Sequence, residues 1–219
     1  MFITLTAADG HSFDCWLHEA EGARRGGLVI LQEIFGVTDQ LKAVAARYAA
    51  QGYDVAIPAL FDRQRRGAVV AFDNIADARA LMVGADIDTA ILDVDATVKA
   101  LAARGGKVAV MGYCWGGGLA LRAAQSCGVA CGVSFYGTRL QAFLDRPLPV
   151  PMQGHFGSHD DHTPPAVLDQ VKAAYPNFEI NVYEAGHAFA NEERPAIYDA
   201  AATELAYQRT DAFLAKSLA

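Results

Sequence analysis

The chain has 219 residues, of which 53% are hydrophobic and 20% charged, a balance that supports a large core and excludes a disordered chain. Its formal net charge of −7 argues against nucleic acid or an anionic membrane surface as the main partner. The length fits a single domain over residues 1–219.

The N-terminal part alternates apolar and polar residues at 2–5 and 13–17 around Ala-Asp-Gly, which predicts a hairpin. Residues 27–31 are continuously apolar, as expected of a strand buried on both faces. The next segments are predicted, in order, as a helix at 39–51, a strand at 53–57, an arginine-rich loop at 60–70 and mostly helical structure at 73–104, interrupted near Gly84. A strand at 107–111 and a helix at 116–126 follow, and then strands at 129–136 and 150–156. The last predicted elements are a helix at 164–174, a strand at 178–184 and a final helix at 195–218.

This alternation of strands and helices predicts an α/β fold, with a mostly parallel central sheet covered by helices on both faces. In such sheets, binding and catalytic residues lie at the carboxyl ends of the strands. Chemically active side chains follow four of the predicted strands: Glu33, Cys114, the pair Asp160 and Asp161, and His187. A sheet core does not need that set, so we expect a catalytic site at this edge.

Cys114 lies in the pattern Gly112-Tyr113-Cys114-Trp115-Gly116, which is a nucleophile elbow with sulfur in place of oxygen. A tight turn from strand to helix needs glycine on both sides, because the backbones approach closely. The turn also places the sulfur at a helix N-terminus, which favours the thiolate. The alternative is a small buried hydrophobic residue in a glycine-rich turn.

The order Cys114, Asp160, His187 is the nucleophile, acid and histidine order of an α/β-hydrolase triad. A histidine on the loop after the last strand can reach the thiol and take its proton. Asp161 is the alternative acid, although we favour Asp160, and the carboxylate that is not used would cap the next helix or face solvent. A metal site at residues 159–162 is disfavoured, because four adjacent polar residues on one turn cannot converge on one ion. We expect no metal.

Two backbone amides are candidates for an oxyanion hole, namely that of Trp115, after the nucleophile, and that of Ile34, after the strand at 27–31. Glu33 adjoins this loop. Its carboxylate is expected to contact the thiol or the histidine, and to hold the resting thiol protonated until substrate displaces it.

Several stretches resemble the dienelactone hydrolase family (carboxymethylenebutenolidases) of the α/β-hydrolase superfamily. They are residues 32–36 (QEIFG), 112–117 (GYCWGG), 134–137 (SFYG), 157–160 (GSHD) and 183–189 (YEAGHAF). The resemblance implies a Cys114–His187–Asp160 triad, with Glu33 as a switching carboxylate at the resting cysteine. It also implies cofactor-free hydrolysis of a small enol lactone, of the type that converts dienelactone to maleylacetate.

The resemblance does not extend to the family's substrate-binding residues. The position four residues after the histidine, an arginine in the family, is Asn191 here, and Ala188 stands where a serine is expected. The family's other substrate-binding residues, which include a tyrosine, lie in the segment before the helix expected at about 85–100, and this segment has Arg79 but no tyrosine here. The substrate-binding candidates are therefore Phe35, Arg63, Arg66, Arg79, Tyr136, Phe189 and Arg194. The loop at 60–72 is a candidate lid.

The N-terminus lacks the basic and long apolar regions of a signal peptide, and no apolar run reaches the ~18 residues of a membrane span. We therefore expect a cytoplasmic protein, a monomer or small homo-oligomer, with thiols rather than disulfides. Cys127 and Cys131 are interpreted as buried packing residues, since no second pair completes a zinc set.

Two further functions compete with enol-lactone hydrolysis. The same scaffold could hydrolyse a different small ester or lactone, which the Asn191 departure favours. Alternatively, Cys114 could be a redox-sensing or ligand-sensing thiol that is oxidised or alkylated without turnover. Sensing, however, needs neither His187 nor the order of a triad.

Overall fold

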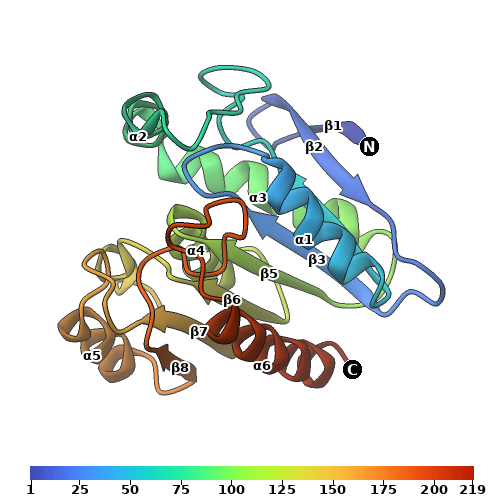
Figure 1. Ribbon diagram of the computed structural model, residues 1–219. Coiled ribbons are helices and arrows are strands. Elements are labelled where there is room, and N and C mark those ends of the chain that lie inside the picture. The colour runs from blue at the N-terminus through green and yellow to red at the C-terminus, as the bar shows by residue number, and fades with distance from the viewer.

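The computed structural model describes residues 1–219 and contains one eight-stranded sheet, in the order β1-β2-β4-β3-β5-β6-β7-β8 (Figure 1). The pairs β1–β2 and β2–β4 are antiparallel, and every pair from β4 to β8 is parallel. The strands are β1 (Phe2–Thr6), β2 (Ser12–His18), β3 (Gly26–Leu31), β4 (Tyr53–Pro58), β5 (Val108–Tyr113), β6 (Cys131–Phe135), β7 (Met152–Gly157) and β8 (Phe178–Tyr183). The predicted mostly parallel sheet is confirmed.

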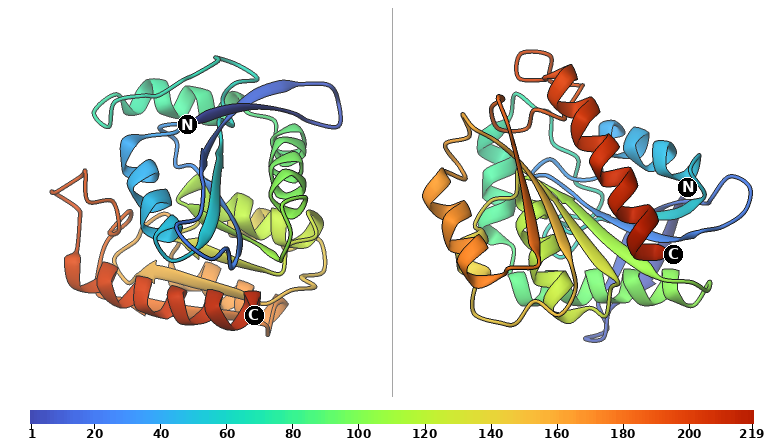
Figure 2. Two further views of the ribbon diagram at one scale, coloured as in Figure 1. Left: turned by 90° about the vertical axis from the view of Figure 1, so that its right-hand side faces the viewer. Right: turned by 90° about the horizontal axis from the view of Figure 1, so that it is seen from below.

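Helices cover both faces of this sheet (Figure 2). They are α1 (Asp39–Ala49), α2 (Ile75–Gly84), α3 (Ile87–Ala102), α4 (Trp115–Ser126), α5 (Pro165–Ala174) and α6 (Ala200–Leu218), with a short 3-10 helix η1 (Leu140–Phe143). Helices α1 and α6 pack in one core cluster, and α3, α4 and α5 pack in the other. Because side chains alternate along a strand, Val29 of β3 faces the second cluster while Leu28 faces the first.

The predicted elements are confirmed with changes at their ends. The segment 73–104 forms two helices, and the second begins where the Asp86 side chain accepts a hydrogen bond from Thr89 N at 2.8 Å. The final helix begins at Ala200 rather than at residue 195, because Asp199 caps it by accepting from Ala202 N at 2.8 Å. The predicted start was therefore wrong, and the residues between β8 and α6 form a loop.

All four cysteines are free, and Cys15, Cys127 and Cys131 are buried, as the packing interpretation of the last two predicted. No helix combines the length and apolar character needed to cross a bilayer.

Candidate active site

Cys114 occupies the turn between β5 and α4, with φ 52° and ψ −117°. A Cβ on Gly112 would overlap the carbonyl of Gly116, and a Cβ on Gly116 would overlap the carbonyl of Leu31. The Gly116 N–H also donates to the Gln32 carbonyl at 3.0 Å, which ties the turn to the loop after β3. The two glycines are thus required by close backbone approach, and the turn lifts the sulfur above the sheet.

Two short contacts join the cysteine to a histidine and a carboxylate. His187 Nε2 lies 3.2 Å from Cys114 Sγ, and His187 Nδ1 lies 2.8 Å from Asp160 Oδ2. The side chain of Asp160 is buried, and its second oxygen accepts from His162 N at 2.9 Å. Asp161 is exposed and makes no side-chain hydrogen bond, so Asp160 is the carboxylate that can orient the imidazole.

This arrangement favours the charged form of His187. Burial alone would lower its pKa, but hydrogen bonds with Asp160 and Cys114 outweigh burial and raise the pKa to about 10. An imidazolium at this distance stabilises a thiolate, which is the reactive form of cysteine. The three residues can therefore supply a nucleophile, a proton carrier and an orienting acid.

The amides of Ile34 and Trp115 are both without an acceptor in the protein. Trp115 is the first residue of α4, where backbone N–H groups lack helical partners. Ile34 lines the same cavity as Cys114. The two groups are available to bind a developing oxyanion at the cysteine.

No hydrogen bond joins Glu33 to the thiol or to His187 in this structure, and the expectation that Glu33 holds the resting cysteine protonated stays a prediction. Its Oε2 accepts from Asn191 Nδ2 at 2.8 Å, while the thiol is hydrogen-bonded to His187. Glu33 Oε1, Asn191 Oδ1 and the Tyr136 hydroxyl are buried without a partner. Burial raises the pKa of Glu33 and outweighs the hydrogen bond from Asn191 and the nearby positive charges of His187 and Arg194, which lower it.

A cavity of about 470 Å³ opens over Cys114 and His187. Three of the predicted substrate-binding residues line it, namely Phe35, Arg79 and Arg194. Tyr136 and Phe189 do not. They pack behind the histidine, with the Tyr136 ring 5.3 Å from that of His187 and 5.5 Å from that of Phe189.

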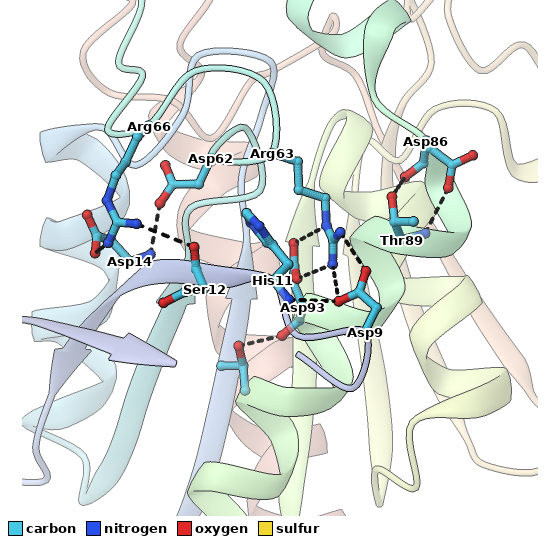
Figure 3. Close-up of polar contacts among 11 residues, drawn as sticks. Asp9, His11, Ser12, Asp14, Asp62, Arg63, Arg66, Asp86, Thr89 and Asp93 are labelled. Carbon is cyan, nitrogen blue, oxygen red and sulfur yellow. Dashed lines mark hydrogen bonds and ion pairs between the residues drawn. The ribbon is translucent and has the colours of Figure 1, made fainter. Parts of the chain in front are cut away.

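Arg63 and Arg66 lie outside the cavity, so the expectation that they bind substrate is corrected. Arg63 makes two hydrogen bonds to Asp93 of α3, at 2.8 and 2.9 Å, and reaches Asp9 in the β1–β2 turn at 2.8 Å (Figure 3). Arg66 pairs with Asp14. Both arginines are occupied in fixing the loop after β4 to the rest of the fold.

Other cavity residues were not predicted from the sequence. Arg139 lies in the loop after β6, which ends at Phe135, and its place beyond the carboxyl end of a parallel strand was the signal that could have identified it. The His162 ring lies 4.5 Å from that of His187 and was considered only as part of a metal site. The remaining new lining residues are Ile75, Met82, Thr138 and Gln141. No group of histidine, cysteine and carboxylate side chains is arranged to hold a metal ion.

A mostly parallel sheet with Cys114 in a tight strand-to-helix turn after β5, a carboxylate after β7 and a histidine after β8 is the arrangement of an α/β hydrolase. A structural neighbour supports this class: the dienelactone hydrolase-like promiscuous phosphotriesterase from metagenomic libraries superposes with a TM-score of 0.82. The match covers 100% of this chain and 99% of the other, at 19% identity.

The chain belongs to the dienelactone hydrolase family, whose profile matches residues 13–218. The carboxymethylenebutenolidase of a Pseudomonas species is 30% identical over 221 residues, covering 95% of this chain and 92% of the relative. That of Pseudomonas putida is 30% identical over 225 residues, covering 97% and 95%. The chain is therefore an ester hydrolase of this family.

Proposed function

We propose that the chain hydrolyses small activated esters or enol lactones through a thioester on Cys114. The observation that carries this proposal is the 3.2 Å contact between Cys114 Sγ and His187 Nε2, with Asp160 behind the histidine at 2.8 Å. The site opens into a cavity large enough for a small substrate. The names of the carboxymethylenebutenolidase relatives support an enol lactone such as dienelactone as the type of substrate.

Acylation begins when the thiolate attacks the ester carbonyl. The Ile34 and Trp115 amides hold the oxyanion, and the carbon–oxygen bond to the leaving group then breaks. His187 gives its proton to the departing oxygen and becomes neutral. An enolate or phenolate leaves the tetrahedral intermediate readily, so the intermediate collapses to the thioester rather than expelling the thiolate again.

Deacylation uses water, with the now neutral His187 as general base. Water attacks the thioester carbonyl, loses a proton to the imidazole, and the Cys114 thiolate departs. Simple alkyl esters are poor substrates in this scheme, because an alkoxide leaves the first tetrahedral intermediate less readily than the thiolate does. Efficient turnover of ethyl esters would contradict the proposal.

The substrate is proposed to be anionic. Eight of the 13 arginines in this acidic chain form ion pairs with carboxylates. Of the five that do not, three line the cavity: Arg79, Arg139 and Arg194. Guanidinium groups without a carboxylate partner beside a nucleophile are suited to hold a substrate carboxylate.

A different ester or lactone on the same scaffold is the second candidate function, and Asn191 favours it. This residue stands where the family resemblance places a substrate-binding arginine, but its Nδ2 donates a hydrogen bond to Glu33. The cavity arginines therefore come from other positions of the chain. The dienelactone-type substrate is the first to test, and the anionic character of the substrate is common to both candidates.

The test is the ultraviolet decay of cis- and trans-dienelactone with wild type and with Cys114→Ala. The proposal predicts that wild type consumes at least one lactone and that Cys114→Ala consumes neither. If wild type is inactive on both lactones but hydrolyses other activated esters through Cys114, the second candidate takes its place. If Cys114→Ala retains activity, the thioester mechanism is wrong.

A further inference from the structure

Arg139 is held in a backbone conformation that is unfavourable for an arginine. It has φ 59° and ψ 22°, in the left-handed region, and it precedes η1. Only four non-glycine residues have positive φ: Cys114, Tyr136, Arg139 and Ala188. Three of them line the cavity, and the fourth packs against His187. Such strain concentrates at functional positions, and all four of these residues, Arg139 and Cys114 among them, lie at or beside the site.

Arg139 and Arg194 lie on opposite sides of the nucleophile. In the sheet, β5 has β3 on one side and β6 on the other. Arg194 comes from the loop after β8, but its guanidinium reaches the β3 side, where it lies 5.5 Å from the centre of the Phe35 ring and 5.8 Å from that of Phe72. Arg139 follows β6, next to Thr138, whose N–H donates to the Cys114 carbonyl at 3.1 Å. Neither arginine has a carboxylate partner in the protein.

The chemistry assigns different parts of the substrate to these two sides. The leaving oxygen must lie beside His187 Nε2, which gives it a proton. His187 and Asp160 follow β8 and β7, on the same side of β5 as Arg139. The leaving group therefore extends toward Arg139, and the acyl group is left to extend toward Arg194.

We propose that Arg139 forms a second anion subsite, which binds a carboxylate on the leaving-group side of the scissile bond, while Arg194 binds one on the acyl side. This inference rests on the proposed function and narrows its substrate class. The preferred substrates are esters or lactones with an anionic group on the leaving-group side, on the acyl side or on both, and dienelactone, with its single carboxylate on the enol side, uses the Arg139 subsite.

Two pairs of synthetic esters test the two sides separately. The first pair is 4-acetoxybenzoate and its neutral methyl ester, which differ in charge on the leaving group. The second is mono-4-nitrophenyl adipate and its methyl ester, which differ in charge on the acyl group. The measured quantity is the ratio of kcat/KM for the anionic ester to kcat/KM for its neutral partner, at low ionic strength because salt screens exposed charges. A ratio is insensitive to a general loss of active enzyme.

Arg139→Gln is expected to lower the 4-acetoxybenzoate ratio by about tenfold and to change the adipate ratio little. Arg194→Gln is expected to do the reverse. Arg139→Lys, which keeps the charge, should retain most of the first ratio. Arg25→Gln is the matched control: Arg25 also lacks a carboxylate partner, but it lies over the Tyr53 ring away from the cavity, so both ratios should stay at wild-type values.

The proposal is overturned if Arg139→Gln leaves the 4-acetoxybenzoate ratio unchanged, or if it lowers both ratios equally. The second result would indicate a general field of positive charge rather than a subsite. Failure of the proposed function has a different signature, since Cys114→Ala would then still hydrolyse the neutral esters. If wild type hydrolyses none of the four esters, the subsite proposal is overturned, whereas the proposed function is still decided by the dienelactone assay with wild type and Cys114→Ala.

Discussion

Asn191 donates a hydrogen bond from Nδ2 to Glu33 Oε2 at 2.8 Å, and both side chains are almost completely buried. The contact joins the loop after β8 to the loop after β3, beside the candidate nucleophile. No positively charged side chain forms an ion pair with Glu33, and its second oxygen is unpartnered. A buried carboxyl in such surroundings stabilises the fold when protonated and costs stability when charged.

Glu33→Gln is therefore expected to stabilise the protein at alkaline pH. The folded state raises the pKa of Glu33 above its unfolded value of 4.5, so the stability that this group contributes is complete below pH 4.5 and falls as pH rises through the folded pKa. Gln keeps an acceptor for Asn191 and carries no charge. We expect a gain of roughly 1–3 kcal/mol in the free energy of unfolding at pH 8, shrinking toward pH 5.

Urea denaturation at pH 5 and pH 8 measures this gain. Glu192→Gln is the control, because Glu192 is an exposed carboxylate on the same loop. A gain of equal size at both pH values would show that titration of Glu33 is not its origin. Activity measured in parallel would show whether the buried carboxyl is kept for turnover at the expense of stability.

Asp160→Asn is expected to reduce kcat/KM by about 10²–10⁴-fold on an activated ester. The carboxylate both orients the His187 ring and helps to raise its pKa, so the imidazole of the variant should support the reactive thiolate less well. The rate of Cys114 alkylation by iodoacetamide, followed from pH 5 to 9, reports the thiolate directly. Asp161→Asn removes an adjacent but exposed carboxylate. Equal effects of the two substitutions would contradict the assignment of Asp160.

The buried side chain of His155 is expected to make the stability of the fold sensitive to acid. His155 is a buried residue of β7 that contacts β8 and α6. One ring nitrogen lies 2.7 Å from the hydroxyl of Tyr183 in β8, and the other lies 2.9 Å from the hydroxyl of Thr210 in α6. Burial, aided by the charge of Arg209, lowers its pKa to about 3. The unfolded chain, with a pKa near 6.5, then binds more protons between these values, so stability is lost as pH falls below 6.5.

Up to about 4 kcal/mol of unfolding free energy is expected to disappear between pH 7 and pH 3 through this one group. His155→Gln should be less stable at pH 7, where it breaks the buried hydrogen bonds, but should show a shallower decline in acid. His159→Gln, at an exposed position, provides the comparison. Identical slopes in wild type and His155→Gln over pH 7 to 4 would exclude His155 as the source of acid sensitivity.

The sequence predicts which candidate catalytic residue follows which strand better than it predicts contacts between distant parts of the chain. The apolar run at β3, the glycines around Cys114 and the placement of Asp160 and His187 after β7 and β8 depend on local pattern, and the structure brings these three side chains within hydrogen-bonding distance. Arg139 was missed because its relevance depends on which way a side chain points at a strand end, which periodicity does not specify.

The ion pairs of the arginine-rich loop also depend on long-range contacts that the local sequence does not indicate. The pattern 63–66 marks a loop with three arginines, but nothing local indicates that Arg63 pairs with Asp93, 30 residues further along. A composition-based interpretation therefore favoured substrate binding for residues that stabilise the fold. Similarly, Pro195 suggested a helix start, whereas Asp199 supplies the side-chain cap that begins α6.

Arg63→Gln is expected to destabilise the protein by roughly 2–4 kcal/mol, because it leaves the fully buried Asp93 carboxylate without its counter-charge (Figure 3). Burial already raises the pKa of Asp93, so protonation can relieve part of the penalty, and the loss should be larger at pH 8 than at pH 5. The loop that Arg63 anchors also carries Phe61, whose ring stacks on that of Trp115, the neighbour of Cys114, at a centroid distance of 5.3 Å.

Arg65→Gln is the matched control on the same loop. Its partner Asp77 is in an ion pair that is exposed on both sides, and such pairs contribute little, so a change within about 0.5 kcal/mol is expected. The double variant Arg63→Gln/Asp93→Asn should recover part of the lost stability, since it removes the buried charge together with its partner. Denaturant titrations of the three variants decide the matter: similar losses for Arg63→Gln and Arg65→Gln, without recovery in the double variant, would show that the buried pair does not anchor this loop.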